Sequence, residues 1–130
     1  MSDTPMTIPA CLQAFNDHEL AQWLRGLDAS VAEGRRREHE TLTAWYAALR
    51  DSAELEQRRR RGEDADDTLI LQSLYRAAVA LPEDRRQRLM TSYDDLFMGR
   101  STVPPKHPLA MLGGILHIIL DAASAPPTVA

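Results

Sequence analysis

The most apolar stretch of the chain lies near its C-terminal end, from Pro108 to Ala123. Between Leu109 and Leu120 there is no charged residue, and His117 is the one polar side chain. This run is shorter than the about 20 residues that a membrane-spanning helix needs, so we expect a core element. Read as a helix, it is apolar on nearly every side, which predicts that other helices surround it.

Small residues fall on one stripe of this predicted helix, and His117 continues the stripe: Ala110, Gly113, Gly114 and His117. A stripe without large side chains lets another backbone come close or leaves a groove. We therefore predict either close packing or a pocket along it. A histidine in such a place is most often a core or interface residue.

Gly113 and Gly114 also permit a different structure for this segment. Two glycines between apolar runs are typical of a tight hairpin turn, so LAML and ILHIIL are candidate strands. Helix formers before the glycines, and Pro108 at the first helical position, favour the helix. The hairpin remains the alternative.

Apolar residues recur at helical spacing in four further segments between residues 16 and 99. Asn16 or Asp17 is the expected cap of the first segment, and the longest, Asp28 to Arg61, is expected to bend near Gly34. Gly62 stands where a helix ends, which predicts an antiparallel pair on either side of it. We therefore predict an all-α fold: a four- to five-helix bundle, residues 16–123, with a buried C-terminal apolar helix. Residues 1–15 are expected to form a flexible arm and residues 124–130 a disordered tail.

The longest segment contains two arginine clusters: Arg35, Arg36 and Arg37, then Arg58, Arg59, Arg60 and Arg61. Carboxylates are mixed with both, and the net charge of the chain is −4, so no overall basic field attracts nucleic acid. Arginines before Gly62 and carboxylates after it also complement the dipoles of two consecutive helices. We keep the seven arginines as candidate partner-binding residues.

No catalytic or metal-binding pattern is present in the sequence. The four histidines form no HExxH or similar spacing, no nucleophile motif occurs, and Cys11 is the single cysteine. We therefore expect no enzyme activity, metal or cofactor. The N-terminus lacks the features of a signal peptide, which indicates the cytoplasm. Arginine outnumbers lysine 14 to 1, which is typical of GC-rich bacterial coding.

These observations favour a small non-enzymatic bacterial interaction protein: an adaptor, secretion-type chaperone or inhibitor that presents a helical surface to another protein. An apolar segment that four short helices cover with difficulty suggests a homodimer as the simplest solution. The alternative is a nucleic-acid-associated regulator that uses Arg35–Arg37 and Arg58–Arg61. A third possibility is an apolar small-molecule pocket at Gly113, Gly114 and His117.

Overall fold

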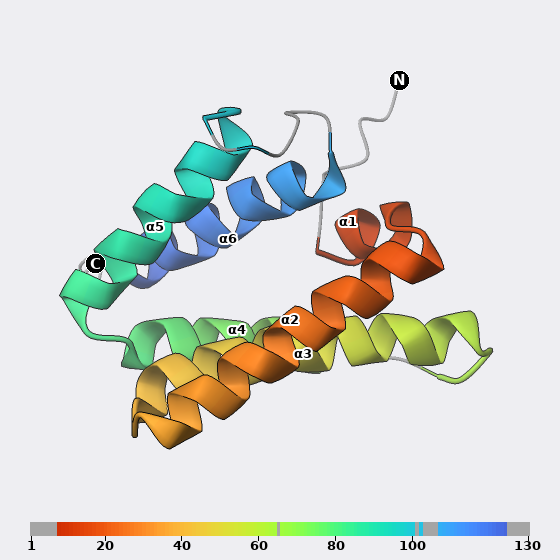
Figure 1. Cartoon of the computed structure of the whole chain (residues 1–130), viewed down its shortest axis with the longest axis horizontal. Coiled ribbons are helices and arrows are strands. Elements are labelled where there is room, and N and C mark those ends of the chain that lie inside the picture. The colour runs from red at the N-terminus through yellow and green to blue at the C-terminus, as the bar shows by residue number, and fades with distance from the viewer. Residues whose placement is uncertain (1–7, 65, 101, 103–106, 125–130) are drawn as a thin grey trace, which may run out of the picture.

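The structure is a computed structural model that describes residues 8–64, 66–100, 102 and 107–124, and these residues contain helices and no strand (Figure 1). The all-α prediction is confirmed. The helices of the described residues are α1 (Ile8–Ala14), α2 (Asp17–Arg36), α3 (Glu40–Arg60), α4 (Asp67–Ala80), α5 (Glu83–Phe97) and α6 (Pro108–Ser124). They are six, so the predicted four to five is too low.

The additional helix is α1, which lies where we expected an irregular arm. Its buried residues Ile8, Cys11 and Leu12 follow helical spacing and pack into the core. Pro9 stands in the first turn, where backbone N–H groups have no partner within the helix, so proline causes no loss of a hydrogen bond there. The remainder of the expected arm, residues 1–7, and the expected tail beyond Ser124 lie outside the described residues.

Local signals set most helix ends. The Asn16 side chain accepts a hydrogen bond from the Glu19 N–H (2.8 Å), and the Glu19 carboxylate accepts one from the Asn16 N–H (2.9 Å), so α2 begins with a capping box. Gly62 and Gly99 follow α3 and α5 with φ of 83° and 75°, the left-handed conformation that ends helices. The Asp66 carboxylate caps α4 by accepting from the Thr68 N–H (3.0 Å).

The break expected near Gly34 comes slightly later, where Glu38 adopts a left-handed φ of 58° between α2 and α3. Gly34 itself is buried inside α2, and a Cβ there would collide with the Thr43 side chain of α3. Gly34 therefore allows α2 and α3 to approach each other closely, and the chain turns at Glu38.

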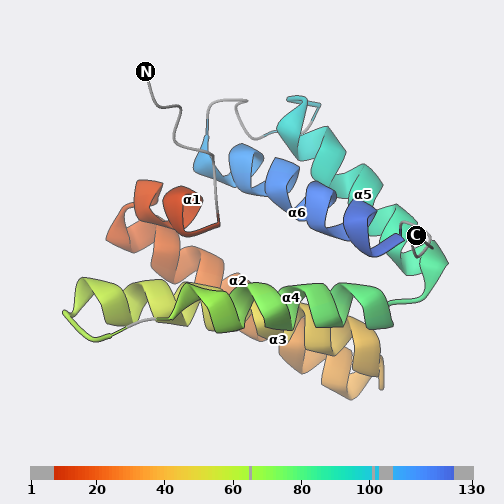
Figure 2. The ribbon, with the colours of Figure 1, turned by 180° about the vertical axis from the view of Figure 1, so that it is seen from behind.

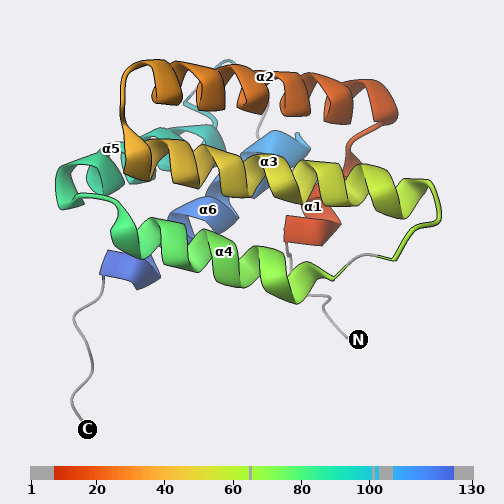
Figure 3. The same cartoon turned by 90° about the horizontal axis from the view of Figure 1, so that it is seen from below.

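The helices form two layers (Figures 2 and 3). α2, α3 and α4 lie side by side in one layer, and α5 pairs with α6 in the other. α4 also packs on α6, and α1 contacts both α3 and α6. In the core, Trp45 Nε1 donates a hydrogen bond to Tyr93 Oη (3.0 Å) and so joins α3 to α5, while burial raises the pKa of Tyr93 above its ordinary value.

Residues 108–124 form one helix, so the hairpin alternative is wrong. This helix buries Leu112, Leu116 and Leu120 completely, yet Ile118 is 69% exposed. α6 is therefore covered on one side, not surrounded as we expected. The uncovered side defines the candidate site below.

Candidate functional site

Exposed and partly exposed apolar side chains gather where α4 and α6 lie next to each other. We call this surface the α4–α6 face and define it by Leu71, Tyr75, Ile115, Ile118 and Ala122. Leu71 is 54% exposed, Tyr75 49% and Ile118 69%. Leu71 and Tyr75 are four residues apart on α4, and Ile115, Ile118 and Ala122 recur at helical spacing on α6. Each helix therefore contributes one continuous apolar stripe.

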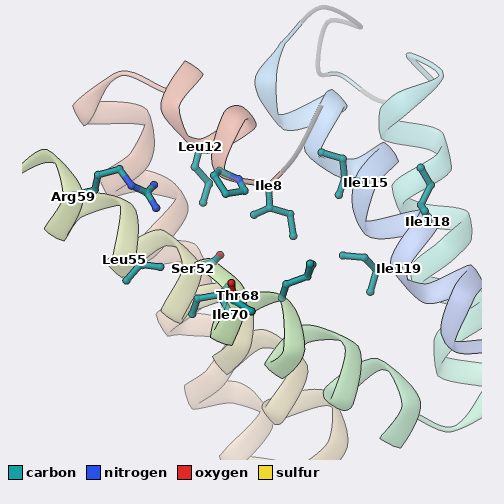
Figure 4. A pocket seen from close by; sticks show the side chains of 12 residues that line it. Ile8, Leu12, Ser52, Leu55, Arg59, Thr68, Ile70, Ile115, Ile118 and Ile119 are labelled. Atoms are coloured by element: carbon teal, nitrogen blue, oxygen red, sulfur yellow. The ribbon is translucent and has the colours of Figure 1, made fainter. Parts of the chain in front are cut away.

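A pocket of about 630 Å³ opens at one end of this face, between α1, α3, α4 and α6 (Figure 4). Its lining is apolar apart from three residues, and consists of Ile8, Pro9, Leu12, Ser52, Leu55, Arg59, Thr68, Ile70, Leu71, Ile115, Ile118 and Ile119. A volume of this size is within the range of pockets that hold a ligand or several side chains of a partner.

Shallower hollows extend the pocket along the face. One of about 550 Å³ shares Leu71, Ile118 and Ile119 with the pocket and continues to Tyr75 and Arg76. Another, of about 390 Å³, lies on the other side of Ile118, over Phe97 of α5 and the following Met98. The hydrophobic surface is therefore a groove with extensions, and it crosses three helices.

Two of the three polar side chains at the pocket, Ser52 and Arg59, have partners in the chain. Ser52 Oγ donates to the Leu49 carbonyl (2.6 Å), and Arg59 Nη1 pairs with Glu56 Oε1 (2.5 Å). Among the described residues there is no group of three His, Cys, Asp or Glu side chains that could hold a metal ion. The geometry of the pocket suits apolar groups more than polar ones.

The structure places the second arginine cluster in ion pairs at the end of α3. Arg58 pairs with Glu54, Arg59 and Arg60 with Glu56, and Arg61 with Glu63. Arg60 also reaches Asp17 Oδ1 (2.6 Å), and its Nη2 donates to the carbonyls of Leu12 (2.9 Å) and Phe15 (2.6 Å). This guanidinium therefore holds α1 and the start of α2 against α3.

The first cluster lies at the opposite end of α3, so the two clusters do not form one basic surface. Arg36 and Arg37 both pair with Glu33, and Arg35 is exposed. Intermixed charges of this kind are typical of a solvated face. The nucleic-acid alternative thus receives no support from the placement of these arginines.

The small-residue stripe of α6 lies against α5. Ala110 is fully buried, and a Cβ at Gly113 would lie 3.1 Å from both the Tyr93 carbonyl and Leu96 Cβ. A Cβ at Gly114 would lie 2.7 Å from the Phe97 ring. These positions therefore let two helices approach closely.

His117 stands at the rim of this contact. Its Nδ1 is 3.8 Å from Asp94 Oδ1, and it borders the shallow hollow over Phe97. The larger pocket lies on the other flank of α6, at Ile115, Ile118 and Ile119. The isoleucine spacing and the stripe of Leu71 and Tyr75 on α4 were the signals in the sequence that could have located it.

Cys11 gives a test of how firmly α1 is docked. It is 1% exposed, and burial raises the pKa of its thiol to about 11. Because the thiolate is the reactive form, we expect Ellman's reagent at pH 8 to react at least about tenfold more slowly with the native protein than with the protein in guanidinium chloride. Equal rates would show that α1 detaches from the core in solution.

Comparison of the chain with models of known protein families, with curated proteins and with solved structures finds no match. No helix in the described part of the chain has the length and apolar character needed to cross a membrane. The assignment of the candidate site thus rests on the geometry of this chain alone.

Proposed function

We propose that this protein is a small, non-enzymatic interaction module that binds another protein through the α4–α6 face. In this proposal it acts in the bacterial cytoplasm as an adaptor, chaperone or inhibitor. The observation that carries the proposal is the exposure of Leu71, Tyr75 and Ile118 around the pocket and the hollow that continues it. Large contiguous apolar patches on protein surfaces mark interaction sites, whereas single scattered apolar residues do not.

The shape of the face favours a helix as the bound element. α4 and α6 run side by side, and the pocket and its neighbouring hollow form a groove between them. An amphipathic helix binds such a groove by inserting apolar side chains at positions i, i+3, i+4 and i+7. The arginine clusters have a structural role in this proposal, because their carboxylate partners lie within the same chain.

Photocrosslinking in the native host tests the proposal. Benzoylphenylalanine at position 71 or 118 should give crosslinked products, because both side chains stand on the face. The matched control is position 25, an exposed residue of α2. This helix is separated from α4 by α3 (Figure 3). The proposal fails if positions 71 and 118 give no product, or if position 25 gives the same products.

A further inference from the structure

The α4–α6 face carries both a projecting side chain and a pocket. Ile118 is 69% exposed and stands at the edge of the pocket of about 630 Å³. Leu71 is exposed on the opposite edge. A surface that has both a projection and a hollow can bind a copy of itself, since each copy offers the side chain that the other can bury.

The charges on the two flanks of the face have opposite sign. On the α4 flank, Arg76 lines the hollow that also contains Tyr75. On the α6 flank, Asp121 follows Gly114 and His117 on one helical stripe, and those two residues face Phe97 and Asp94 of α5. Neither Arg76 nor Asp121 has an ion-pair partner among the residues that the structure describes. Within this described part of the chain, one unpaired cation, Arg76 of α4, and one unpaired carboxylate, Asp121 of α6, therefore border the face, and the Arg86 guanidinium at the end of α6 is already bonded to the Ala123 carbonyl.

A two-fold axis can bring these opposite flanks together. α4 and α6 run in the same direction (Figures 2 and 3), and Arg76 of α4 and Ala122 of α6 line the same hollow. A two-fold axis parallel to the helices places α4 of each copy over α6 of the other. Such a rotation leaves the position of every residue along the helix direction unchanged. Arg76 then faces Asp121 of the partner subunit, twice in each dimer. An axis across the helices would instead place like flanks on each other.

We propose that the chain forms a symmetric homodimer in which α4 of each protomer packs over α6 of the other, with Ile118 and Leu71 buried at the centre. This inference rests on the proposed function, because it uses the same face and names a second copy as the occupant. In this arrangement both copies use the same residues, so one substitution changes the interface at two places.

Charge reversal with rescue tests the arrangement. The full-length protein should sediment as a dimer with a dissociation constant of about 10 µM or lower. Arg76→Asp and Asp121→Arg should each weaken dimerisation about tenfold, because each converts two attractive pairs into repulsive ones. The combined variant restores both pairs with inverted polarity and should return to within about threefold of the wild type. Arg25→Asp, on α2, is the matched control and should change nothing.

Ile118→Asp provides an independent measurement. This position is largely exposed in the single chain, so the variant should fold, with an unchanged circular dichroism spectrum, and sediment as a monomer. A wild-type monomer at about 100 µM would overturn the dimer. A dimer that the combined charge variant fails to restore would overturn the α4-over-α6 arrangement. If position 118 crosslinks other proteins while the purified chain is monomeric, only this inference falls and the proposed function stands.

Discussion

Replacing Arg60 with alanine should lower the free energy of unfolding by about 3 kcal/mol, the range expected when one partner of a buried ion pair is removed. Glu56 is 3% exposed and accepts from Arg60 Nε at 2.9 Å. Without Arg60, this carboxylate keeps its ion pair with Arg59 but loses one of two guanidinium partners. The carbonyls of Leu12 and Phe15 lose their donor as well.

Arg58→Ala is the matched control for this prediction. Arg58 lies two residues earlier on α3, its side chain is 50% exposed, and it meets Glu54 at 3.4 Å. An exposed pair of this kind contributes little, so the variant should stay within about 0.5 kcal/mol of the wild type. Urea unfolding followed by tryptophan fluorescence measures both changes. Equal effects of the two substitutions would show that the Glu56–Arg60 pair has no special role in stability.

Gly113→Leu should destabilise the protein by about 3 kcal/mol, because an entire side chain must enter a contact in which a Cβ alone is already tight. The obstacle at 3.1 Å includes the Tyr93 carbonyl, which belongs to the backbone of α5 and cannot rotate away. α5 and α6 must therefore separate to accept the new side chain. Thermal unfolding and loss of near-ultraviolet dichroism from Trp45 and Tyr93 would report this separation.

Gly26→Leu makes the same chemical change in the middle of α2, where nothing lies within 4 Å of the added Cβ. Leucine favours the helix more than glycine does, so this variant should gain about 0.5 kcal/mol. A loss of stability at position 26 comparable with that at 113 would contradict the explanation by close packing. It would indicate instead that neither α2 nor α6 tolerates leucine in place of glycine.

Capping chemistry was predictable because it depends on residues that are neighbours in the chain. Asn16 with Glu19, Asp66 before α4, and Gly62 after α3 each set a helix end with a bond or a backbone angle formed within a few residues. The helical reading of the C-terminal segment succeeded for a related reason. Pro108 and the leucines favour a helix locally, and the sequence offers no further strand to support a lone hairpin.

Features that depend on distant partners were not predictable. α1 is short and contains Pro9, and it is helical because Ile8, Cys11 and Leu12 find the core. The burial of Glu56 depends on guanidinium groups one helical turn away and on the position of α1. Which flank of α6 stays open depends on how α4 and α1 pack beside it, and a pattern within one helix contains no information on that.

Arg60 holds in place the helix that forms one wall of the pocket. Ile8 and Leu12 of α1 form one wall of the pocket, and the carbonyl at the end of that helix accepts from Arg60. A helix of seven residues has no stability in isolation, so its place depends wholly on these tertiary contacts. The width of the groove is thus coupled to Arg60, a cation outside the pocket lining, as well as to the core contacts of α1. A substitution of Arg60 would therefore alter which side chains the groove accepts, although Arg60 itself does not line the pocket.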